Sequence, residues 1–147
     1  MRPLESFDEL AVGQEFEFGS IRMDLEDILD FARRWDPQPF HIDAAAAAAG
    51  PFGGIIASGL HTQAAVFSHI IRTGWVAKVS MGGADQLVRW PAPVRPGDEI
   101  AVSARIEELT PSRSKPDRGI AKVRYTGRRL ADGAVVIDIL GTHILRR

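Results

Sequence analysis

The first clear periodicity along the chain is helical. Between residues 24 and 36, apolar side chains recur every three or four positions, and acidic and basic side chains take the opposite face. Asp24 is a suitable N-cap. Pro37 disfavours helical geometry in the residue before it, so the helix is predicted to end near Asp36. The apolar positions are Leu25, Ile28, Leu29, Ala32 and Trp35.

Two further helices are predicted before residue 74. Six alanines at 44–49 follow Asp43, a possible cap, and Gly50-Pro51 ends the run. A longer helix is predicted over 58–73. Its middle is apolar almost all round, which is typical of a helix that is buried on several sides.

Elsewhere the pattern alternates with the period of a strand. Asp132-Gly133 is a hairpin turn signal, and 111–119 is a polar loop. The segment DPQPFH at 36–41 contains two prolines and is expected to be a stiff, non-helical connection. The predicted strands cover 14–22, 84–90, 98–107, 119–129 and 134–145.

This order of elements predicts an α+β fold in which an antiparallel sheet of about five strands curls around the long helix. No repeat or linker divides the chain, so residues 1–147 are expected to form one domain. Such a sheet has edges that need protection, and a homodimer, or a dimer of dimers, that pairs edge to edge is a natural solution.

Composition narrows the function classes. The net charge of −1 gives no field that would attract nucleic acid or an anionic membrane. The chain has no cysteine, which excludes disulfides, Cys-ligated zinc and thiolate nucleophiles. No secretory signal or membrane-spanning run is visible, so a cytoplasmic protein is expected.

The segment WDPQPFH at 35–41 is the strongest candidate for chemistry. Asp36 and His41 stand at the two ends of a proline-stiffened bend, which suits a pair of titratable groups that must converge on one water or substrate. Histidine exchanges its proton near neutral pH, and a neighbouring carboxylate can orient a water. The alternative is structural: Asp36 would cap a turn, and His41 would be a hydrogen-bonded core residue.

Ser58-Gly59 is the second candidate, because a helix N-terminus offers free N–H groups and a partial positive charge. Gly59 would let a ligand carbonyl approach the backbone, as an oxyanion site for a thioester requires. A plain Ser N-cap followed by glycine is the simpler interpretation of the same residues.

At these residues the sequence resembles the MaoC-like family of hot-dog proteins, which includes (R)-specific enoyl-CoA hydratases. The family signature is Gly-Asp-x-Asn-Pro-(aliphatic)-His, and Asp36, Pro39 and His41 fall on its Asp, Pro and His. Gly59 falls on the glycine of a second family segment, and VRPGD at 94–98 precedes a strand as it often does in hot-dog chains.

The resemblance implies a hot-dog fold and a hydro-lyase that acts on a 2-enoyl or 3-hydroxyacyl thioester, carried by CoA or an acyl carrier. It makes Asp36 and His41 the catalytic pair and Gly59 N–H the oxyanion donor, with Ser58, Gln38 and Phe40 beside the substrate. This chain departs from the signature in four places: Trp35, Gln38, Phe40 and Ser58 stand where the family has glycine, asparagine, an aliphatic residue and often histidine.

No cofactor or metal is expected, because His61 and His69 are eight residues apart on one predicted helix, whereas helical metal ligands are three or four apart.

Two other functions compete with hydration. A thioesterase of this fold usually carries its carboxylate on the central helix, but 60–73 contains no Asp or Glu. A non-catalytic acyl-CoA-binding subunit is the other alternative.

Overall fold

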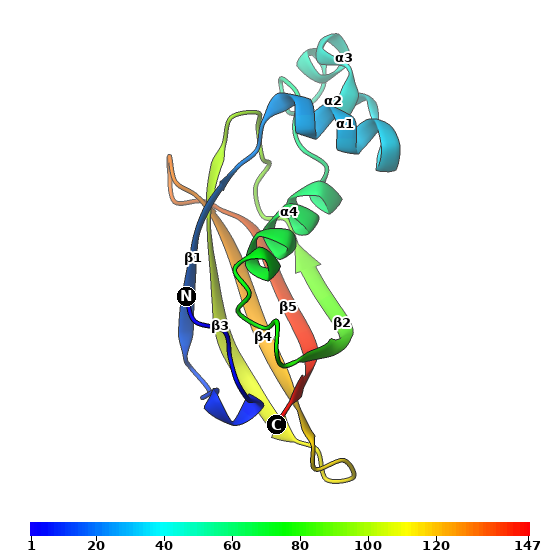
Figure 1. Cartoon of the computed structure of the whole chain (residues 1–147). Coiled ribbons are helices and arrows are strands. Elements are labelled where there is room, and N and C mark those ends of the chain that lie inside the picture. Colours follow the sequence, from blue (N-terminus) through cyan, green and yellow to red (C-terminus); the bar gives the residue numbers. More distant parts are fainter.

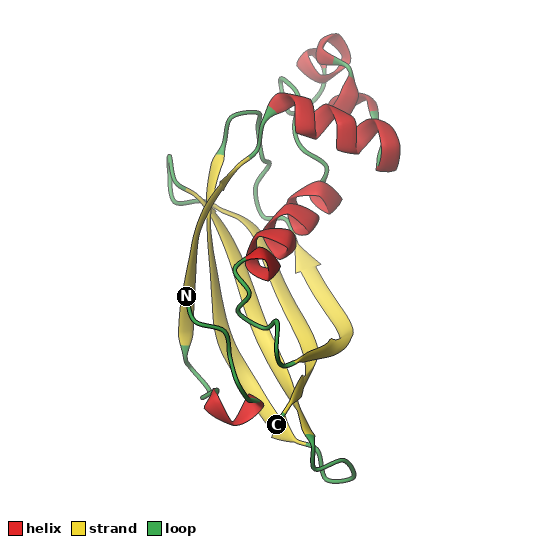
Figure 2. Cartoon of the chain, viewed as in Figure 1, coloured by secondary structure: helices red, strands yellow, loops and turns green.

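The computed structural model describes residues 1–147, which form one five-stranded sheet, four α-helices and a short 3₁₀ turn (Figures 1 and 2). The elements in chain order are η1 (Phe7–Glu9), β1 (Glu15–Arg22), α1 (Leu25–Trp35), α2 (Pro39–Ile42), α3 (Ala44–Ala49), α4 (Gly59–Arg72), β2 (Ser80–Arg89), β3 (Glu99–Pro111), β4 (Arg118–Arg129) and β5 (Val135–Arg146).

The sheet is antiparallel throughout, in the order β1-β3-β4-β5-β2, and α4 lies along its concave face (Figure 1). This confirms the predicted sheet wrapped around a helix. The core lies between the two, where alternate residues of β3 and β4 are buried as their period-two pattern requires. The turn at Asp132-Gly133 is also confirmed, with Gly133 at a positive φ of 72°.

Two strands are longer than predicted. β2 begins at Ser80 rather than near residue 84, and its register against β5 shifts at Gly82 and Gly83, so irregular pairing hides the alternation there. β3 continues to Pro111, which leaves only 112–117 as the loop before β4.

The expectation that α4 is buried on several sides is wrong within this chain. Only Thr62, Val66 and Ile70, on one face, are fully buried. Leu60 and Ile71 are about half exposed, because the sheet covers the helix from one side only. None of the helices combines the length and the apolar character needed to cross a bilayer.

Helices α1, α2 and α3 form a cap beyond the end of the sheet (Figure 1). α1 begins and ends where predicted, but Leu25 and Trp35 are exposed at its two ends rather than buried. The prediction of a non-helical DPQPFH is wrong for its second half, since Pro39 to Ile42 form one helical turn. Proline is accommodated at the first helical position, where no N–H partner is needed.

Candidate active site

The structure brings Asp36 and His41 together. Asp36 ends α1, and its own N–H still donates to Ala32 O at 2.9 Å. The chain then turns within two residues, as Gln38 N–H donates to Asp36 O and His41 N–H donates to Gln38 O. This bend places Asp36 Oδ2 3.3 Å from His41 Nε2, with the histidine almost fully buried.

Asp36 is held by side-chain donors on both oxygens. Ser58 Oγ donates to Oδ2 at 2.7 Å, and Gln38 Nε2 donates to Oδ1 at 2.7 Å. Partial burial acts to raise the pKa of Asp36, but these two hydrogen bonds and the nearby His41 together outweigh burial and bring the pKa below its usual value of 3.8. Asp36 is therefore ionised at neutral pH.

The tautomer of neutral His41 is fixed by the backbone. Its Nδ1 lies 2.7 Å from Ile56 O, and a carbonyl can only accept, so Nδ1 carries the hydrogen. Nε2 is then the basic nitrogen, and it is the one that faces Asp36. A second bond, from Ile56 N–H to Phe40 O at 3.2 Å, ties the same two segments together.

The N-terminus of α4 is the third part of the candidate site, beside Asp36 and His41. Ser58 Oγ accepts from Leu60 N–H at 3.2 Å, which confirms Ser58 as the N-cap. Gly59 N–H donates to no group of the chain, as expected at the start of a helix. Asp36, His41 and Gly59 line the same cavity of about 400 Å³.

A family model described as a MaoC like domain matches residues 8–128. The chain belongs to this MaoC-like family. A MaoC-like dehydratase from Rhodospirillum rubrum has a similar crystal structure, with a TM-score of 0.88, 35% identity and 95% of both chains covered. The fold is therefore the hot-dog fold that the sequence resemblance implied.

Two relatives are similar in sequence to this MaoC-like chain. The uncharacterized protein YdeM of Bacillus subtilis is 34% identical over 109 residues, which cover 74% of this chain and 77% of that protein. The 3-hydroxybutyryl-CoA dehydratase of Methylorubrum extorquens is 34% identical over 113 residues, covering 74% of this chain and 68% of that protein.

Not every predicted site residue of the MaoC-like domain reaches the cavity. Gln38 lines it, but Ser58 is fully buried behind Asp36. Phe40 also lies outside the lining and packs against the rings of His41 and Phe52, at centroid distances of 4.4 and 5.8 Å. The structure thus gives Ser58 and Phe40 supporting contacts rather than a place beside the cavity.

Several lining residues carry no recognisable sequence signal. Leu60 and Thr62 follow Gly59 on α4, and the opposite wall comes from 90–94 and Val136. Trp90 is one of these residues. Its position beside Gly59 depends on how β2 ends against α4, a tertiary contact that local pattern does not encode.

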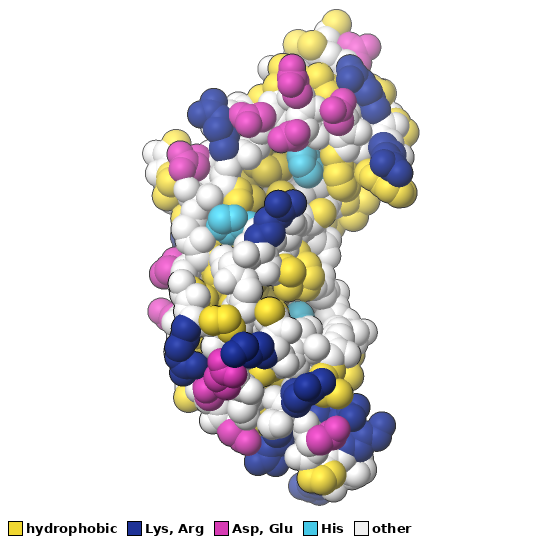
Figure 3. All heavy atoms as spheres, viewed as in Figure 1, with side chains coloured by type: hydrophobic (Ala, Val, Ile, Leu, Met, Phe, Trp, Pro, Cys, Tyr) yellow, Lys and Arg dark blue, Asp and Glu magenta, His cyan; other side chains and the backbone are white.

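The remaining polar candidates are placed away from the cavity. His61 stacks on Phe31, and His69 donates from Nε2 to Phe18 O, so the two histidines make separate contacts. The basic loop at 112–117 joins β3 to β4 at the end of the sheet opposite α1–α3 (Figure 1). Figure 3 shows carboxylates interspersed with Lys and Arg side chains over the outer helices of the cap.

Proposed function

We propose that this chain is a hydro-lyase that adds water to a 2-enoyl thioester, or removes it from a 3-hydroxyacyl thioester. One observation carries the proposal: a carboxylate, an imidazole with a defined basic nitrogen and an unpaired backbone N–H line one cavity. These are, in the same order, a water-orienting group, a base and an oxyanion donor, which the reaction needs together.

In the hydration direction, Asp36 and neutral His41 Nε2 are both acceptors and can hold the two hydrogens of one water. The water oxygen bonds to the β-carbon of the enoyl group while His41 takes one of its protons. The electron pair of the carbon–carbon double bond moves toward the thioester carbonyl, and Gly59 N–H stabilises the resulting oxyanion. His41 then gives this proton to the α-carbon as the carbonyl re-forms, which completes the 3-hydroxyacyl thioester and restores the neutral histidine.

We propose an acyl-CoA as the substrate. The comparison with a 3-hydroxybutyryl-CoA dehydratase supports a CoA ester, and the apolar wall of prolines and valines around the cavity suits an acyl chain. Arg95, which follows the lining residue Val94, donates from Nη2 to the carbonyl of a second lining residue, Phe52, at 2.6 Å.

We further propose that two copies pair through β2. This strand is at one edge of the sheet and is exposed at every position except the partly buried Val88. An open edge with exposed apolar side chains such as Leu87 is suited to pairing with a second copy.

The test is to measure the hydration of a short trans-2-enoyl-CoA through the loss of the enoyl absorbance. Asp36→Asn and His41→Ala are each expected to lower kcat/KM by about a hundredfold or more, because each removes one acid–base group. Asp30→Asn is the matched control, since this exposed carboxylate on the same helix makes only a 3.7 Å contact with Arg33.

Wild-type rates in both variants would remove the pair from the mechanism. Release of free thiol with no change in the enoyl absorbance would identify a thioesterase instead. Tight acyl-CoA binding without turnover over a broad set of acyl chains would identify a binding subunit.

A further inference from the structure

The indole of Trp90 lies against the first residue of α4. Its Nε1–H donates to Gly59 O at 2.9 Å, which joins the end of β2 to the start of the helix. The ring is about half exposed and lines the cavity that also contains Asp36 and His41. Trp90 therefore contacts both the cavity and the residue whose N–H is unpaired.

The same contact explains why residue 59 is glycine. A Cβ at this position would lie 2.6 Å from Cε2 and 2.8 Å from Nε1 of Trp90, closer than carbon atoms approach one another. Gly59 has no positive φ, so backbone conformation does not require glycine. The ring of Trp90 occupies the space that any side chain would need.

We propose that Trp90 is a positioning residue for the oxyanion donor. Its hydrogen bond and ring contact fix the backbone at Gly59, so that Gly59 N–H stays directed into the cavity. The inference rests on the proposed function, because it assigns Trp90 a role in stabilising the oxyanion of that reaction.

The physical need for such a contact comes from the position of Gly59. The first turn of a helix has few intrahelical hydrogen bonds and frays readily. An oxyanion donor must nevertheless hold its distance to the developing charge within a few tenths of an ångström. The indole supplies an anchor from outside the helix.

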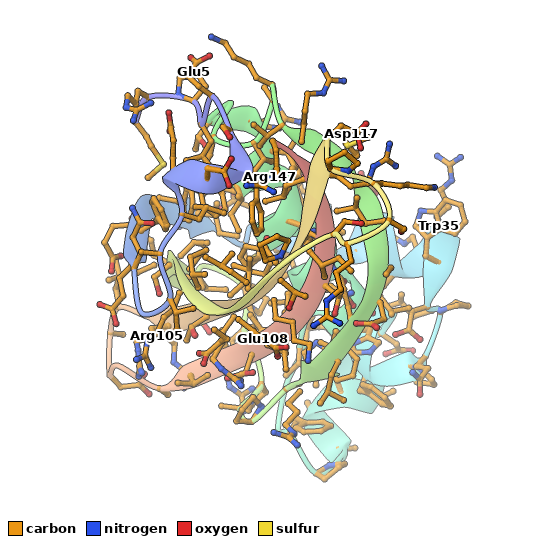
Figure 4. The ribbon with its side chains drawn as sticks, turned by 90° about the horizontal axis from the view of Figure 1, so that it is seen from below. Glu5, Trp35, Arg105, Glu108, Asp117 and Arg147 are labelled. Carbon is orange, nitrogen blue, oxygen red and sulfur yellow. The ribbon has the colours of Figure 1, made fainter.

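Trp90→Phe tests the positioning role, because it keeps an aromatic wall and removes the N–H donor. We expect kcat for hydration of a short 2-enoyl-CoA to fall by about tenfold, the effect of one lost hydrogen bond of moderate strength, with KM changed less than about twofold. The matched control is Trp35→Phe. Trp35 is exposed, stacks only with Arg34 and points away from the sheet (Figure 4), so its variant should keep the wild-type kcat.

A wild-type kcat in Trp90→Phe, or a rise in KM alone, would overturn the inference and leave the proposed function intact. Absence of hydration by the unmodified protein would contradict the proposed function itself. The two failures are therefore separate.

Thermal unfolding supplies a readout that does not depend on turnover. Alanine is a better helix former than glycine, so Gly59→Ala in a Trp90→Ala background should raise Tm by about 2 °C. With Trp90 present, the added methyl meets the ring, and the same substitution should lower Tm by about 5 °C. An increase in both backgrounds would show that the ring does not constrain Gly59, and would overturn the inference.

Discussion

The buried hydroxyl of Ser58 makes two hydrogen bonds. It donates to Asp36 and accepts from Leu60 N–H, so the orientation of the carboxylate and the start of α4 depend on the same side chain. The family resemblance placed Ser58 at a position where the family signature often has histidine. In this chain the hydroxyl lies behind the carboxylate and outside the cavity lining, where its hydrogen bond lowers the pKa of Asp36.

Ser58→Ala should therefore change the acid behaviour of the protein. The free energy of unfolding is expected to fall by about 1–2 kcal/mol, since a cap and a donor to a carboxylate are both lost. The pKa of Asp36 should rise, because one of the hydrogen bonds that lower it disappears. Urea titrations and carboxyl NMR titrations measure the two effects.

The direction of the pH dependence follows from linkage. The folded-state pKa of Asp36 lies below 3.8, so its ionisation stabilises the fold above the unfolded pKa, and this contribution is lost as pH falls through the folded pKa. In Ser58→Ala this contribution should be smaller, and its loss should be complete at a higher pH than in the wild type. Ser68→Ala is the control, because Ser68 lies on the same helix and only accepts from Arg72; an equal shift in that variant would contradict the explanation.

At the scale of elements, local pattern predicted most of the structure. The periodicity of Ile100, Val102, Ala104 and Ile106 identified β3 and its buried face, since alternation is a direct consequence of the strand. The local pattern failed where tertiary contacts determine the structure. The turn of α2 was missed because prolines were read as breakers, and the far wall of the cavity was missed because no local rule brings 90–94 to α4.

That far wall is held by one partly buried arginine. Arg129 Nη1 donates to Pro93 O at 2.8 Å and lies 3.3 Å from Asp98, while Asp98 also accepts from Arg95 N–H. The loop over 91–98 is thus tied to the end of β4, and the wall of the cavity depends on this connection.

Arg129→Lys should loosen the loop, because lysine cannot reach both Pro93 and Asp98 with a planar fork of donors. We expect the free energy of unfolding to fall by about 2 kcal/mol and KM for the acyl thioester to rise. Urea denaturation and steady-state kinetics measure these changes. Arg128→Lys, at an exposed neighbour that bonds only to Gly133 O, should change neither quantity.

At the scale of the whole molecule, the sheet has two different edges. β1 is the strand at one edge, and the exposed β2 is the strand at the other edge. Leu60 and Ile71 of α4 are also about half exposed. The long helix looked fully buried from its sequence because its outer face is also apolar. The second copy proposed above would cover that face, and such a dimer would bury the helix as its pattern predicts.

Leu87→Lys on β2 should therefore convert the dimer to a monomer, because it places a charge in the centre of the proposed contact. Sedimentation velocity distinguishes the two states. Leu130→Lys is the matched control at an equally exposed leucine in the turn between β4 and β5, and it should leave the dimer intact. A monomeric wild-type protein would contradict this pairing.

The cavity lining comes from two separate parts of the chain, and this separation has an evolutionary consequence. Asp36, His41 and Gly59 come from one continuous stretch of 24 residues, whereas the opposing surface comes from 90–94 and Val136. Mutations in the distant segment can reshape what fits without disturbing the reactive groups. For the proposed hydration, the acyl group that is accepted could change in this way while Asp36, His41 and Gly59 stay the same. The positions to vary in directed evolution toward new acyl groups are therefore Pro91, Ala92, Val94 and Val136.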